Sequence, residues 1–84
     1  MNYENAIATI TVVSKGGRKV IERVTRIRHS YSNLVSGDMH LHLNEGYCLE
    51  ILIARGSLER IMEFIDRIKT VKGVWEGKYT LVPI

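Results

Sequence analysis

The sequence lacks long hydrophobic runs, and its 84 residues include only one cysteine and one proline. No apolar stretch approaches the ~18 residues of a membrane-spanning helix. The first five residues have neither the basic region nor the apolar region of a signal peptide. We therefore expect a cytoplasmic protein with no membrane association. The single cysteine, Cys48, cannot form an internal disulfide, so it is free to act as a structural thiol, a nucleophile or a metal ligand.

The sequence also lacks a strong excess of either charge, because it has twelve basic and nine acidic residues and a net charge of only +3. The basic residues of the first half are spread along a predicted helix, which favours a solvated helix face over a nucleic-acid surface. The hydrophobic fraction of 45% is that of an ordinary globular protein. A domain this small often gains stability from a metal or from oligomerisation.

Hydrophobic periodicity predicts six regular elements. One helix begins at Arg18, and a second begins after Ser57, a plausible N-cap, and stops before Gly73. Strands are predicted over residues 6–14, 35–43, 47–54 and 75–83. This β-α-β-β-α-β order predicts an α+β, ferredoxin-like sandwich, in which two helices cover one face of a four-stranded antiparallel sheet. We expect a short amino-terminal tail, residues 1–5, followed by a single domain over residues 6–84.

Three potential metal ligands lie on the central hairpin. If residues 44–46 form its turn, His42 faces Cys48 across the two strands, and His40 lies on the same face two residues earlier. Two imidazoles and a thiolate at this spacing can close around one ion. Glu50 should lie opposite His40, where it is a candidate to accept the second ring N–H of a ligating histidine. The competing interpretation is that these are ordinary half-exposed polar residues of a strand.

The alternation of residues 35–43 also predicts which face carries these side chains. Val35, Met39, Leu41 and Leu43 form the apolar side of the strand, so we expect that side to lie under the helices. The histidines and Cys48 would then project from the open face of the sheet, where a second subunit could cover them.

His29 is the fourth candidate ligand. The first helix has its apolar stripe at Val20, Val24, Ile27 and Tyr31, which places His29 nearly opposite, on the outer surface. With the sheet between them, His29 could not reach the triad of its own chain and could only meet that of another subunit. Taken alone, it would be an ordinary exposed helix histidine.

The segment His29-x10-His40-x-His42-x5-Cys48-Leu49-Glu50 resembles the metal-binding pattern of the nickel-responsive regulator NikR. The likeness covers the ACT-like carboxy-terminal domain of that family. It implies that His40, His42 and Cys48 bind Ni(II) from one subunit, that His29 comes from a neighbouring subunit, and that the site is square-planar in a homotetramer. The ligand types alone would also suit Cu(II) or Zn(II).

One departure from the family concerns its amino-terminal ribbon-helix-helix DNA-binding domain. Only five residues precede the first predicted strand, too few for such a domain. The chain is either a regulatory domain cut from a longer protein or a stand-alone relative, and Met1 favours the second. In either case we expect no direct DNA binding by the family's route.

Other functions are weighed against metal binding. The fold would permit an ACT-type module that binds an amino acid or a similar small molecule. An enzyme is not expected, because no oxyanion-hole or phosphate-loop motif accompanies Cys48. The central strands lack the paired aromatic residues that stack RNA bases, and we expect Trp75 to be a partly buried packing residue.

Overall fold

The structure, a computed structural model, describes residues 4–84 and contains the six regular elements expected from the sequence. Their order in the chain is β1 (Asn5–Lys15), α1 (Arg18–Ser30), β2 (Val35–His42), β3 (Tyr47–Ser57), α2 (Leu58–Lys69) and β4 (Val74–Pro83). Asn5, which was assigned to the predicted tail, already belongs to β1. The rest of that tail, apart from Glu4, lies outside the described residues.

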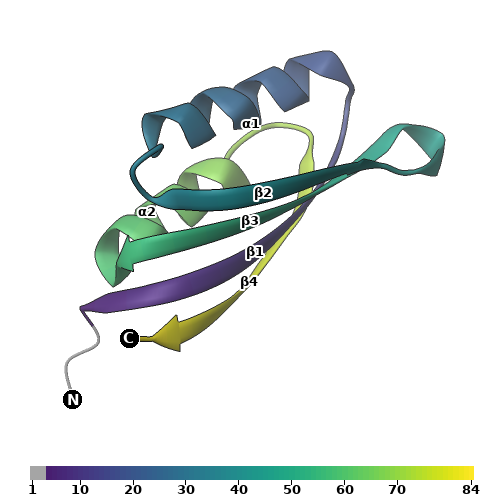
Figure 1. Ribbon diagram of the computed structural model, residues 1–84. Coiled ribbons are helices and arrows are strands. Elements are labelled where there is room, and N and C mark those ends of the chain that lie inside the picture. The colour runs from purple at the N-terminus through teal and green to yellow at the C-terminus, as the bar shows by residue number, and fades with distance from the viewer. Residues whose placement is uncertain (1–3) are drawn as a thin grey trace.

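The four strands form one sheet in the order β2-β3-β1-β4, and each neighbouring pair is antiparallel. Figure 1 shows both helices on the same side of this sheet, with the β2–β3 turn extending past them. The predicted ferredoxin-like arrangement is therefore confirmed. Neither helix of the described part is long and apolar enough to span a membrane.

The core lies between the sheet and the two helices. Alternate side chains of β1 and β3 face the helices, so each strand contributes a buried column on that side. Tyr31, at the end of α1, packs on Phe64 of α2 with ring centroids 5.1 Å apart. The buried core comprises Ala6, Ala8, Ile10, Val12, Tyr31, Leu34, Leu52, Ala54, Ile61, Phe64, Ile65 and Ile68.

Local signals set the ends of the helices where the sequence indicates them. The side chain of Ser57 accepts a hydrogen bond from the backbone N–H of Arg60 at 3.2 Å, which caps α2 as predicted. After α2 the chain turns at Gly73, whose φ is 103°. A Cβ at Gly73 would lie 2.4 Å from Val20 Cγ2 and 2.8 Å from the Lys15 carbonyl oxygen, so the turn requires glycine in this place.

The prediction of which face of β2 the helices cover is wrong. Met39, Leu41 and Leu43 are 56%, 46% and 46% exposed, and they lie on the open face. The central strands β1 and β3 decide which face the helices bury, whereas β2 is an edge strand and carries its apolar side outward. A bulge between Val35 and Gly37 also moves Val35 away from the Met39 side and pairs it with Ala54 of the buried column.

Candidate metal centre

The hairpin formed by β2 and β3 brings the three predicted ligands together. The Leu43 N–H donates to the Tyr47 carbonyl oxygen at 2.8 Å and closes the predicted turn. Both Glu45 and Gly46 adopt left-handed φ values, 64° and 80°, within that turn. A glycine adopts this conformation readily, whereas Glu45 is the one non-glycine residue of the described part with a positive φ. From there the register places His42 opposite Cys48, as expected.

The donor atoms of this triad lie close enough to share one ion. Cys48 Sγ is 3.6 Å from His42 Nδ1, and the rings of His40 and His42 have centroids 4.9 Å apart. One donor atom from each of His40, His42 and Cys48 lies within 4.8 Å of the others. Donors that bind the same ion at roughly 2.0 Å for nitrogen and 2.3 Å for sulfur can be no more than about 4.3 Å apart. A small rotation of the side chains would bring this set around a metal.

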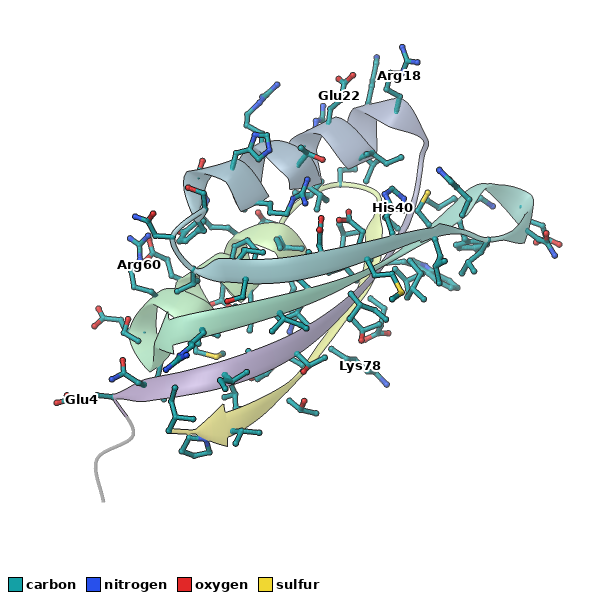
Figure 2. All side chains as sticks on the ribbon, viewed as in Figure 1. Glu4, Arg18, Glu22, His40, Arg60 and Lys78 are labelled. Atoms are coloured by element: carbon teal, nitrogen blue, oxygen red, sulfur yellow. The ribbon has the colours of Figure 1, made fainter. Side chains whose placement is uncertain are left out.

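The triad lies on the helix-covered side of the sheet, which corrects the expected open-face position. Cys48 and Glu50 belong to the same alternating column of β3 as the core residue Leu52, and all three are buried. His40 and His42 are nevertheless exposed, because the hairpin end of the sheet extends past the helices (Figure 1). Figure 2 shows His40 on the edge of β2 that faces α1. One side of the triad is thus open to an incoming ligand.

Glu50 is paired with His40 in the strand register, as the sequence predicted. Its carboxyl group is buried, and this burial raises its pKa above the ordinary value of 4.5. The charges of His40 and Arg28 act in the opposite direction, while that of Asp38 raises the pKa further. Asp38 itself accepts a hydrogen bond from the Arg28 guanidinium and forms an ion pair with it. Of the two carboxylates on this face, Glu50 is the one in register with a triad histidine.

His29 lies apart from the triad within the described residues. It is exposed in the last turn of α1 and is absent from the group of converging donors. The outer-surface position is as predicted, but the reason given for its separation is wrong, since α1 and the triad are on the same side of the sheet. Its neighbour Arg28 contacts Asp38, which precedes His40 on β2 and lies further from the turn.

The sequence did not predict two features around this end of the sheet. Ser14 is buried in β1 and is paired with Cys48 in the register. The alternation of β1 could have predicted this burial, because Ser14 follows Val12 by two residues and occupies the next helix-facing position, where an apolar residue is expected. Trp75, which was expected to be partly buried, is 74% exposed. It packs against Tyr47 with ring centroids 5.4 Å apart and the ring planes tilted by 41°, instead of entering the core.

The sequence model of the protein family described as the NikR C-terminal nickel-binding domain matches residues 7–82 of this chain. The chain belongs to this family. This membership confirms the resemblance that was found in the sequence. The triad of His40, His42 and Cys48 therefore occurs in a chain whose family is described as nickel-binding.

Two archaeal relatives illustrate the likeness, and both are named as nickel-responsive regulators. That of Methanocaldococcus jannaschii is 33% identical over 79 residues, which are 94% of this chain and 56% of the relative. Regulator 3 of Methanosarcina mazei is 36% identical over 77 residues, which are 90% of this chain and 55% of the relative. The chain therefore spans about half the length of these relatives.

Solved structures support the fold. An uncharacterized protein from Thermotoga maritima superposes with a TM-score of 0.78 at 16% identity and covers 96% of this chain and 99% of its own. The ACT domain of the GTP pyrophosphokinase from Chlorobium tepidum gives a TM-score of 0.73 at 14% identity and covers 90% and 99%. At these identities the likeness shows an ACT-like fold alone.

Proposed function

We propose that this chain is a nickel-binding regulatory domain, in which His40, His42 and Cys48 bind one Ni(II) per subunit and His29 of a second copy completes the site. The observation that carries the proposal is the convergence of two imidazoles and one thiol within 4.8 Å in a chain whose family is described as nickel-binding. A bound ion would join two subunits, so the degree of oligomerisation would depend on the metal concentration.

The chemistry of the triad fits a borderline transition metal. Imidazole nitrogens suit nickel, copper and zinc, and a thiolate adds affinity for the softer of these ions. The ligand types would favour Cu(II) over Ni(II) by the general order of stabilities, so the choice of nickel is supported by the family. Binding requires neutral imidazoles and a deprotonated thiol, and affinity should therefore fall as the pH is lowered.

Two separate surfaces support assembly beyond a dimer. On the helix side, the triad has an open flank and His29 stands exposed on α1 of the same chain. On the opposite side of the sheet, Met39, Leu41, Ile53 and Val82 leave a broad apolar surface exposed, and such surfaces mark interaction sites. An oligomer that closes both surfaces by symmetry is a tetramer of dihedral type.

Titration of Ni(II) into metal-free protein purified without a histidine tag tests the site. The wild type should gain thiolate-to-nickel absorption that saturates at one equivalent per chain. Cys48→Ser, which keeps the size of the side chain, should lack this absorption while retaining the circular dichroism of the fold. Absence of the absorption from the folded wild type would refute the proposal. Competition by Cu(II) and Zn(II) then ranks the metals.

The second candidate is an ACT-type module that binds an amino acid or a similar small molecule. The likeness to a solved ACT domain favours it at the level of the fold only. Calorimetry separates the two candidates, because heat on addition of amino acids, with none on addition of Ni(II), would support the ACT-type module. We assign no catalytic role to Cys48, since its neighbours form a cation-binding set.

A further inference from the structure

The described part of the chain has two buried polar or charged residues, Ser14 and Glu50, and both are neighbours of Cys48. Glu50 follows it by two residues along β3, and Ser14 is its partner across the β1–β3 pair. The row across the sheet at this level is therefore His42, Cys48 and Ser14, on strands β2, β3 and β1. Polarity within the buried layer is concentrated at the predicted metal centre.

Ser14 breaks an otherwise apolar column. The helix-facing residues that precede it on β1 are alanine, isoleucine and valine, and its own exposed fraction is 8%. None of the side-chain hydrogen bonds within residues 4–84 involves its hydroxyl. The hydroxyl at this position is therefore free to donate to an acceptor that forms in another state of the protein.

The geometry points to Cys48 as that acceptor. Side chains directly opposite each other in an antiparallel pair have Cβ atoms about 4.5 to 5.5 Å apart, so a hydroxyl and a sulfur on these atoms can meet by rotation about χ1. A neutral thiol is a weak acceptor, whereas a thiolate accepts a hydrogen bond about twice as strong as a neutral one.

We propose that the Ser14 hydroxyl donates a hydrogen bond to the Cys48 sulfur once that sulfur is a metal-bound thiolate. This inference rests on the proposed function of the triad. The hydrogen bond would withdraw electron density from the sulfur and orient it toward the ion, as groups around metal ligands commonly do. Ser14 is therefore a positioning residue, which acts on the metal through Cys48.

The test compares two substitutions of nearly equal size, with Ni(II) as the probe. Ser14→Thr keeps the hydroxyl and Ser14→Val replaces it with a methyl group. In Ser14→Val the thiolate-to-nickel absorption should move to longer wavelength, because sulfur lone pairs that lose a hydrogen bond lie higher in energy. Nickel affinity should fall roughly 10-fold, at the lower end of such effects. Ser14→Thr should reproduce the wild-type wavelength, as should Ser36→Ala on the exposed part of β2.

Separate outcomes identify which claim fails. If the wild type shows thiolate-to-nickel absorption and Ser14→Val shows the same wavelength and affinity, the role of Ser14 is wrong and the metal site stands. If the folded wild type shows no such absorption, the proposed function fails instead. Should Ser14→Val not fold, Ser14→Ala provides the same comparison without added bulk, and an unchanged spectrum in that variant would overturn the inference equally.

Discussion

Replacement of Glu50 by glutamine should have opposite effects on the metal-free and metal-bound protein. In the metal-free protein, burial raises the pKa of Glu50, so the folded state disfavours the ionised carboxylate. Glutamine has no charge to bury, and Glu50→Gln should therefore stabilise the metal-free fold at neutral pH. With metal bound, the same carboxylate, which lies opposite His40 in the strand register, should accept the free ring N–H of that histidine, so the substitution should weaken binding.

The expected loss of metal affinity is about 10- to 100-fold, the usual cost of removing a group that supports a ligand. At a free metal concentration of about 1,000 times the wild-type Kd, binding stabilises the wild type by about 4.1 kcal/mol. For the variant, the same metal concentration is about 100 to 10 times its own Kd, so binding stabilises its fold by about 2.7 to 1.4 kcal/mol. Chemical unfolding with and without Ni(II) measures this difference directly.

The pH dependence of the metal-free protein gives an independent check of the same residue. Because the folded-state pKa of Glu50 lies above 4.5, stability should decline as the pH rises from the ordinary carboxyl range through that raised pKa. Glu50→Gln should remove this decline, whereas Glu63→Gln on the exposed face of α2 should leave it. A variant that is less stable without metal and binds Ni(II) as tightly as the wild type would refute the reasoning.

Two further predictions concern the scaffold. Phe64 is fully buried, so Phe64→Ala should lower the free energy of unfolding by about 3–5 kcal/mol in denaturant titration; a loss below 1 kcal/mol would contradict the packing described. Gly73→Ala should cost more than about 1 kcal/mol, since the added Cβ meets a carbonyl oxygen 2.8 Å away at a φ of 103°. Gly37→Ala is its control, because a Cβ there has no neighbour within 4 Å, and equal losses in both variants would refute the role of Gly73.

The order of elements and the hairpin register were predictable from the sequence because both follow from local signals. Periodicity distinguishes the helices from the strands, and the turn at residues 44–46 fixes the pairing of His42 with Cys48. With that pairing set, the convergence of the triad follows from strand geometry alone. The residues of the site could therefore be selected before their surroundings were known.

The face of the sheet on which the triad lies was not predictable from β2 alone. In this strand the apolar side, with Met39 and Leu41, is exposed, because β2 is at the edge and burial is decided by its neighbours. The buried face is set by the central strands β1 and β3, in which the residues that alternate with Ser14 and with Cys48 lie on the same side of the sheet. Both faces of those strands contain apolar residues, so only the packing of α1 and α2 identifies the buried one.

The exposure of Trp75 was missed for a related reason. Large aromatic residues are usually buried, but Trp75 lies where the pairing of β1 with β4 shifts its register. That irregularity leaves the indole outside the core and against Tyr47. A shift in strand pairing depends on contacts between distant segments, which periodicity does not report.

The central claim is that each metal site takes ligands from two copies of the chain, and mixing two variants tests it most directly. His29→Ala keeps the triad but loses the donor from α1, and Cys48→Ala keeps that donor but breaks the triad. Each variant alone should lack tight thiolate-to-nickel absorption. Co-refolded in equal amounts, they should regain about one quarter of the wild-type sites, because half of the random pairs then contain one complete site of two. Absorption no greater than the sum of the separate variants, or wild-type binding by His29→Ala alone, would contradict the claim.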